Sequence, residues 1–183
     1  MSKMTEIIDK YLQKWVDLDL NKLPIRKIEN EMANPNENRR SEWKTWCPID
    51  SKVNDLEVND FEKQIGFNLP KAYKDFLKHK HFYELQIDQA SFCSHPINIW
   101  RLSLTEIIYN GYPREYIIDK GYMPFANWSD WGLLCFNTNE KVIGHNYPVV
   151  IWDHERFDKF ELQSDDFEQL IISLDKETIK NAS

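Results

Sequence analysis

Apolar residues recur at helical spacing in three separate stretches of the sequence. The first covers residues 5–16, the second follows Pro70, and the third follows Ser164. Within each stretch the apolar residues lie three or four positions apart, which places them on one face of a helix. The sequence therefore predicts three amphipathic helices, whose apolar faces carry Ile7, Ile8, Tyr11, Leu12, Trp15 and Val16; Tyr73, Phe76 and Leu77; and Phe167, Leu170, Ile171 and Leu174.

A helix end and a helix start lie next to each other around Gly66. Gly66 can adopt the left-handed conformation that closes a helix, and Pro70 suits the first turn of another. Asn59, followed three residues later by Glu62, predicts the start of the first helix as a capping box. Two short helices that meet at this Gly-x-x-Leu-Pro corner are the expected organising unit, and the first presents Val58, Phe61 and Ile65.

Short apolar runs in the second half of the chain predict the strands of a sheet. Ser103, with Glu106 three residues later, predicts a short helix that ends before Gly111. Pro113 and Gly121 bound a further turn. Helices, then a mainly antiparallel meander with helices packed on it, then a C-terminal helix predict an α+β fold. The expected strands are residues 81–87, 97–102, 122–126, 131–136, 148–152 and 159–162, and residues 141–143 are expected to pair with the strand at 131–136.

The stretch before the corner predicts an N-terminal arm. Residues 21–38 are polar, contain Pro24 and Pro35, and are expected to form a connecting loop with a short helical piece. Trp43 and Trp46 follow, and large aromatic side chains this close together usually bury against a core. We therefore expect a helical arm packed on a main domain, followed by a short tail: residues 1–57, 58–176 and 177–183.

Composition favours one packed domain in a reducing compartment. With 42% hydrophobic and 14% aromatic residues against only 5 glycines, the chain can bury a sizeable core. Its 3 cysteines are widely spaced, and the first residues are charged and amphipathic, unlike a signal peptide. No apolar run approaches the length that spans a membrane. A cytoplasmic protein with reduced thiols and no membrane contact is expected.

The net charge of −7 is unevenly distributed along the chain. Between Asp153 and Glu177, nine acidic and three basic residues give 3 − 9 = −6. Direct binding of nucleic acid, a polyanion, is therefore not expected. The acidic segment has two interpretations: a surface that steers a basic partner, or a solvated helix face. Ser164 is the expected N-cap of the last helix, with Asp165 and Asp166 favourable in its first turn.

Two close pairs of metal-binding residue types occur, His79-x-His81 and Cys93-x-His95. Neither has the spacing of a zinc ribbon or zinc finger, and two more ligands would have to come from elsewhere. We expect structural or surface histidines, with no metal and no cofactor.

The sequence offers little for catalysis. Cys135 with His145 or His154 would need a base within hydrogen-bond reach and an oxyanion site. Cys135, however, lies in an expected strand, where a small buried cysteine is common. There is no Gly-x-Ser-x-Gly, no glycine-rich phosphate loop and no His-Glu-x-x-His. A non-enzymatic protein is therefore expected.

The run Trp128-Ser129-Asp130-Trp131 is the most distinctive surface candidate. Tryptophan is enriched at interface hot spots, and we expect Trp128 to be exposed. Trp131 has two interpretations, a surface residue or a core residue in phase with Leu133. Acidic residues after the last central strand and at the start of the last helix are either partner contacts or structural. The candidate partner-binding residues are Trp128, Asp130, Trp131, Asp153, Glu155, Asp165 and Asp166.

Four segments between Val58 and Leu174 resemble, in the right order, the signature segments of the SMI1/KNR4 (SUKH) superfamily. The chain departs from the superfamily's pattern at Lys78–His81, where a glycine-containing turn is frequent, and at Asn137, where aspartate is frequent. The resemblance implies a SUKH-like α+β fold. The segments are Phe61-Glu62-x-x-Ile65-Gly66-x-x-Leu69-Pro70-x-x-Tyr73-x-x-Phe76-Leu77; Pro124-Phe125-Ala126 with Gly132 to Phe136; Pro148-Val149-Val150-Ile151-Trp152-Asp153-His154-Glu155; and Ser164-x-x-Phe167-x-x-Leu170-Ile171.

The resemblance implies a bacterial immunity protein that binds and neutralises a cognate polymorphic toxin, often a nuclease. Its partner would be a basic toxin domain, against which an acidic surface imitates or repels nucleic acid. Eukaryotic relatives imply an alternative, a regulatory scaffold that binds proteins without inhibiting them. A third class, a small-ligand binder or enzyme, would need a pocket with convergent polar groups and perturbed titratable residues.

Overall fold

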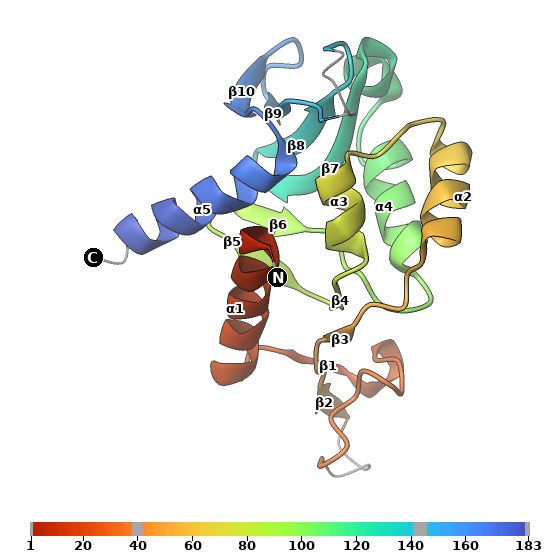
Figure 1. Cartoon of the computed structure of the whole chain (residues 1–183), viewed down its shortest axis with the longest axis vertical. Coiled ribbons are helices and arrows are strands. Elements are labelled where there is room, and N and C mark those ends of the chain that lie inside the picture. The colour runs from red at the N-terminus through yellow and green to blue at the C-terminus, as the bar shows by residue number, and fades with distance from the viewer. Residues whose placement is uncertain (1, 38–41, 141–145, 182–183) are drawn as a thin grey trace.

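The computed structural model describes residues 2–37, 42–140 and 146–181. At its centre lies a six-stranded antiparallel sheet with the strand order β10-β9-β8-β7-β6-β5. Helices precede, interrupt and follow these strands, which confirms the predicted α+β class (Figure 1). The strands are β5 (Leu85–Ile87), β6 (Ala90–Phe92), β7 (Tyr122–Trp128), β8 (Gly132–Asn137), β9 (Val149–Asp153) and β10 (Phe160–Ser164).

The central strands are buried on both faces of the sheet. On β8 and β9, Leu134 and Ile151 join the main core beneath the helices, whereas Leu133 and Trp152 join a smaller cluster. A strand buried on both faces has no polar side to present, so both strands are continuous apolar runs in the sequence. Residues 112–122 contribute to the smaller cluster, and this segment contains η2 (Arg114–Tyr116) and η3 (Ile118–Lys120).

The corner at Gly66 forms as predicted, but its first helix begins earlier. Gly66 has a φ of 70° and ends α2 (Asp55–Ile65) in the left-handed conformation. The N-cap is Asn54, whose capping box is completed by Glu57. The predicted cap at Asn59 is therefore wrong, because an earlier Asn-x-x-Glu pair already satisfies the first free N–H groups.

Glu62 holds this corner together. Its Oε1 accepts a hydrogen bond from the Leu69 N–H at 2.6 Å and forms an ion pair with Lys74 Nζ at 2.7 Å. Its backbone carbonyl accepts from the Phe67 N–H at 3.1 Å. A carboxylate that is only 9% exposed needs such partners to offset its lost hydration. These contacts fix the direction in which α3 (Lys71–Leu77) leaves the corner.

Aromatic rings from α3 and α5 (Phe167–Asn181) form the centre of the main core. The Tyr73 and Phe167 rings meet edge to face at a centroid distance of 5.0 Å, and Phe76 lies 5.4 Å from Phe167. Phe125 and Phe136 of the sheet pack on the same rings. The predicted common core of Tyr73, Phe76, Phe167 and Leu170 is confirmed.

The arm contributes to the same main core. The predicted first helix is confirmed as α1 (Lys3–Asp17), with Ser2 as its N-cap. Trp46 is fully buried, but Trp43 is 58% exposed, so the expectation that both pack inward is wrong for Trp43. Residues three apart on an extended chain point to opposite sides. The arm also contains β1 (Lys22–Pro24), η1 (Ile25–Lys27), β2 (Trp43–Thr45) and β3 (Ile49–Asp50).

Two of the predicted strands are wrong. Residues 81–87 do not form one strand: β4 (Lys80–His81) pairs with β3 of the arm, and only β5 joins the sheet. Residues 97–102 form a turn and the start of α4 (Trp100–Tyr109). Ser103 therefore lies inside this helix and does not cap it. The short apolar run at residues 97–102 resembles a strand, but the buried residues of α4 recur at helical spacing: Trp100, Leu104 and Ile108.

The remaining predicted strands are confirmed as β7 to β10, while residues 141–143 lie outside the described part of the chain. Gly121 closes η3 with a φ of 81°, as expected. The predicted N-cap at Ser164 is wrong, because Asp166 Oδ1 accepts from the Gln169 N–H at 2.8 Å. Ser164 Oγ instead donates to the Asp166 carbonyl.

A buried histidine pair joins the arm to the core. His81 Nδ1 donates to the His95 carbonyl, and His81 Nε2 accepts from the Lys52 N–H of the arm at 2.9 Å. His95 Nε2 donates to the Leu77 carbonyl at 2.8 Å, and the two rings stack 5.0 Å apart. Burial and the neighbouring His81 lower the pKa of His95 to about 3, so His95 is neutral at pH 7.

This pair makes stability depend on pH. The unfolded chain takes up a proton on His95 near pH 6.5, whereas the folded chain does so only near pH 3. Stability should therefore fall on acidification below pH 6.5, by about 1.4 kcal/mol between pH 7.5 and 5.5 from His95. Urea unfolding at these two pH values tests this, and His95→Gln, which keeps a donor to Leu77, should reduce the loss. An unchanged loss in His95→Gln would contradict the assignment.

Phe76→Ala should destabilise the protein by on the order of 3–5 kcal/mol, because it leaves a cavity among rings that cannot collapse. Equilibrium urea unfolding monitored by circular dichroism measures this value. Leu102→Ala on α4, whose side chain is 55% exposed, is the control and should cost well under about 1 kcal/mol. A similarly small cost for Phe76→Ala would show that the α3 face is misassigned.

We also propose that residues 1–57 remain attached to the main domain as a packed arm. Lys10 of α1 pairs with Asp175 at 2.6 Å, and His79 pairs with Asp9 at 2.8 Å. Limited proteolysis should therefore leave the arm bound, even after a cut between residues 34 and 38. Release of the arm with an otherwise unaffected core, seen by gel filtration, would count against this proposal.

Candidate protein-binding site

The sheet separates the acidic candidate residues into two groups at its opposite ends. Asp130 and Trp131 lie in the turn between β7 and β8, and the β8–β9 register pairs Gly132 with Asp153. Asp165 and Asp166 follow β10 at the other end, where Ser164 pairs with Val149. The seven predicted residues therefore do not form one site. We call the first group, formed by Asp130, Trp131, Asp153, His154 and Glu155, the Trp131 end.

The Trp131 end is held by backbone and ring contacts. The His154 N–H donates to the Trp131 carbonyl at 3.1 Å, and the Glu155 N–H donates to Asp153 Oδ1 at 2.9 Å. The Tyr112 ring packs edge-on against Trp152 at 4.8 Å and lies parallel to the His154 ring at 6.2 Å. The loop after β9 is thereby fixed against the β7–β8 turn. No pattern in the sequence pointed to Tyr112, which reaches this site from the segment between α4 and η2.

Trp131 and Trp128 differ in exposure. Trp131 is partly buried against the main core, whereas Leu133 lies in the smaller cluster, so Trp131 is in part a core residue but not in phase with Leu133. Trp128 is only 5% exposed, and the expectation that it is exposed is wrong. β7 continues two residues beyond the predicted end at Ala126, so Trp128 shares the buried face of Ala126. Any partner contact through Trp128 would require this side chain to leave the core.

Ion pairs neutralise part of the acidic C-terminal segment. Asp158 pairs with Lys120, Glu161 with Lys159, and Asp175 with Lys10. Asp166 caps α5 through its carboxylate, as described above. Within the described residues, no ion pair involves Asp130, Asp153 or Glu155. These three carboxylates at the Trp131 end are therefore available to a partner.

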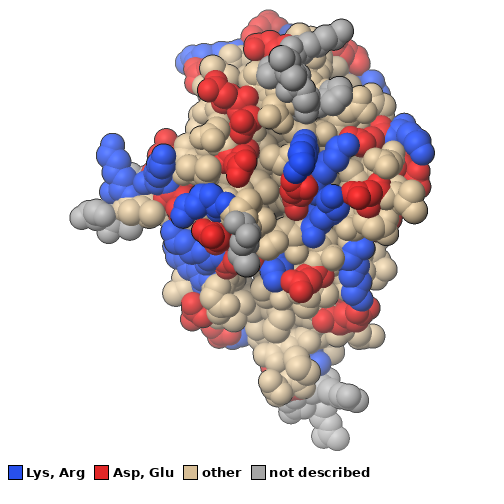
Figure 2. Space-filling view, viewed as in Figure 1, with Lys and Arg blue, Asp and Glu red and all other residues tan. Residues whose placement is uncertain are grey.

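The face shown in Figure 2 carries no large patch of only acidic or only basic residues. Basic and acidic groups alternate over α2 and α3, where Lys63 pairs with Asp60 and Lys71 with Asp75. Such exposed pairs are screened by water and salt and contribute little to stability. The net charge of −7 therefore acts through particular carboxylates rather than through one large patch of this face.

The cysteine thiols are not activated. Burial raises the pKa of Cys135, which lies within β8 with its Sγ 3.9 Å from the Leu133 carbonyl. Cys93 lines a shallow cleft beside Glu106, but burial and that carboxylate raise its pKa to about 12. A thiol with a raised pKa holds little of the thiolate needed for nucleophilic attack.

The histidine pairs considered as metal ligands have other partners. His79 contacts Asp9, whereas both ring nitrogens of His81 are occupied by protein groups. Across the described ranges, no three His, Cys, Asp or Glu side chains gather where they could hold a metal ion. The described helices also include none with the length and apolar character needed to cross a membrane.

The comparison with protein families agrees with the resemblance in the sequence. The sequence model of the SMI1 / KNR4 family (SUKH-1) matches residues 52–173, which begin just before α2 and end in the middle of α5. No curated protein matches the chain. The matched region includes the Glu62 corner, the sheet and the Trp131 end, and it leaves α1 outside. The chain therefore belongs to the SMI1 / KNR4 family (SUKH-1).

Proposed function

We propose that this protein is an immunity protein, which binds a cognate toxin domain and inhibits it by covering its active site or substrate groove. The observation that supports this most directly is the Trp131 end. It combines a partly buried indole with three carboxylates that have no ion-pair partner within the described ranges. A large aromatic side chain provides contact area, and unpaired carboxylates attract a basic partner. Membership of the SUKH family is consistent with this role.

Inhibition by covering a surface requires rigid binding loops and no catalytic step. The two loops of the Trp131 end are joined by the His154–Trp131 backbone hydrogen bond and follow paired strands, so little order is lost on binding. If the toxin is a nuclease, its substrate groove is basic, and Asp130, Asp153 and Glu155 would occupy positions that phosphates otherwise take. The toxin would then be blocked at the surface where its substrate binds.

Reversing the charge at the Trp131 end should slow binding. Asp130→Lys with Glu155→Lys changes the net charge by +4, from −7 to −7 + 4 = −3. The association rate with a basic toxin domain encoded beside this gene should fall about tenfold at low salt. At 1 M salt the Debye length is only about 3 Å, and the rates of the variant and the wild type should converge. Stopped-flow binding over a salt series measures both effects.

A matched control separates a local effect from a change in net charge. Asp60→Lys with Glu177→Lys makes the same +4 change on the exposed faces of α2 and α5, and it should slow association much less. Equal slowing by both pairs would remove the Trp131 end from the interface. Tight binding that leaves the toxin active would support the scaffold alternative. If the toxin does not bind at all, the immunity proposal fails.

A further inference from the structure

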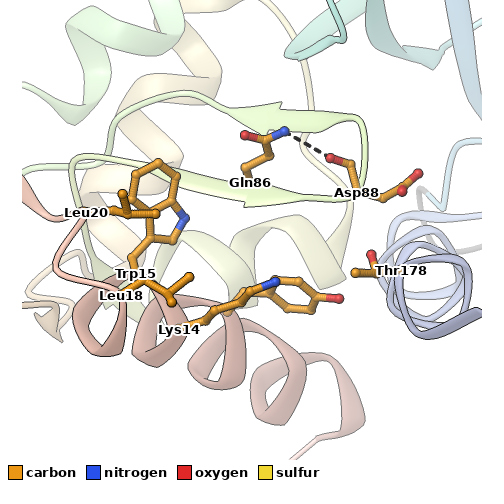
Figure 3. Close-up of a pocket in the computed structure, with 8 residues that line it drawn as sticks. Lys14, Trp15, Leu18, Leu20, Gln86, Asp88 and Thr178 are labelled. Atoms are coloured by element: carbon orange, nitrogen blue, oxygen red, sulfur yellow. Dashed lines mark hydrogen bonds between the residues drawn. The ribbon is translucent and has the colours of Figure 1, made fainter. Parts of the chain in front are cut away.

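A cleft of about 400 Å³ lies where the arm meets the edge of the sheet. Figure 3 shows α1 along one side, the β5–β6 hairpin along the other, and α5 at one end. Six of the eight lining residues fall outside residues 52–173, so the cleft depends on the arm rather than on the family's matched region alone. The lining residues are Tyr11, Lys14, Trp15, Leu18, Leu20, Gln86, Asp88 and Thr178.

One end of the cleft is apolar and held in place. Leu18 and Leu20 are 56% and 52% exposed, and they lie beside Trp15 (Figure 3). The Leu18 N–H donates to the Lys14 carbonyl at 3.1 Å, and the Leu20 N–H donates to the Trp15 carbonyl at 3.0 Å. Asn21, which follows directly, is fully buried. Exposed apolar side chains on a fixed backbone lose little conformational freedom when a partner covers them.

The opposite side of the cleft is the free edge of a strand. β5 is the last strand of the sheet, and a two-residue turn joins it to β6, with Ile87 and Ala90 as the closing pair. The closing pair of such a hairpin exchanges both hydrogen bonds, and the next residue along the strand points its peptide groups outward. The Gln86 N–H and carbonyl therefore face away from β6, and no backbone hydrogen bond to another described segment occupies them.

Two charges of opposite sign lie at different points of the cleft. Lys14 lies along α1, its ammonium 5.9 Å from the centre of the Tyr11 ring, and Asp88 lies at the tip of the hairpin (Figure 3). Neither has an ion-pair partner among the residues that the structure describes, whereas Lys10, one turn earlier, pairs with Asp175. Separated charges suit an elongated occupant with side chains of both signs better than they suit a small ion.

We propose that this cleft binds an extended segment of a partner protein, which adds a strand beside β5. A large apolar side chain of the segment lies against Trp15, Leu18 and Leu20. An acidic side chain lies near Lys14, and a basic one lies near Asp88. Main-chain hydrogen bonds to Gln86 supply affinity, and these three contacts supply specificity. The inference does not depend on the toxin interface at the Trp131 end, so either proposal can fail alone.

Panning a random heptapeptide phage library against the full chain tests this. Phage that also bind the Leu18→Ser/Leu20→Ser variant are removed, and the enriched peptides are synthesised. They should contain a large apolar residue together with an acidic and a basic one. Loss of the two leucines should weaken binding about tenfold or more by calorimetry. Leu56→Ser/Leu102→Ser, which alters leucines that are 76% and 55% exposed on α2 and α4, should leave binding unchanged.

Two further variants test the charge and the strand edge. Lys14→Glu should weaken the enriched peptides about tenfold, whereas Lys3→Glu on the same helix should not. Gln86→Pro removes the outward N–H without breaking a bond to β6 and should weaken binding, whereas Gln86→Ala should not. Thermal melting confirms that each variant folds. The proposal is overturned if no peptide is enriched, or if the enriched peptides bind the Lys14→Glu and Gln86→Pro variants as tightly as the wild type.

Discussion

The buried carboxylate of Glu62 is the constraint on which the arrangement of the helices depends. It receives the Leu69 N–H and the Lys74 ammonium while its own carbonyl closes the end of α2. A charge in this position is stable only when its partners are present, so the corner has one favoured geometry. That geometry directs Tyr73 and Phe76 of α3 onto Phe167 of α5. The aromatic core then holds the helices against the sheet.

The sheet fixes the positions of the loops at its ends. β8 and β9 are buried on both faces, so neither can shift its register without exposing apolar residues or clashing with a covering layer. At Gly132 a β-carbon would approach the Trp152 carbonyl to 2.7 Å, so the strands also meet too closely for any larger residue. The loops at the Trp131 end therefore start from fixed positions, as binding loops on a rigid scaffold do.

The arm adds surface that the family's matched region lacks. α1 buries one face in the common core, and the turn that follows it leaves Leu18 and Leu20 exposed opposite β5. The Trp131 end and this cleft also differ in character. The former presents carboxylates on loops, and the latter combines a strand edge with apolar side chains and both charges. Two such surfaces on one small protein suit contacts with different partners, or with different parts of one partner.

The fold class, the Gly66 corner, the first and last helices and the apolar strands could be predicted from the sequence, because helical and strand periodicity are local properties. The predicted strand at residues 97–102 and the predicted N-cap at Asn59 are wrong, because short apolar or polar patterns fit more than one local structure. Two features came from the packing of the whole chain: Trp128 is buried, and the acidic residues separate to two ends of the sheet. Each of these depends on where strands end and pair, which is set by contacts between residues far apart in the chain.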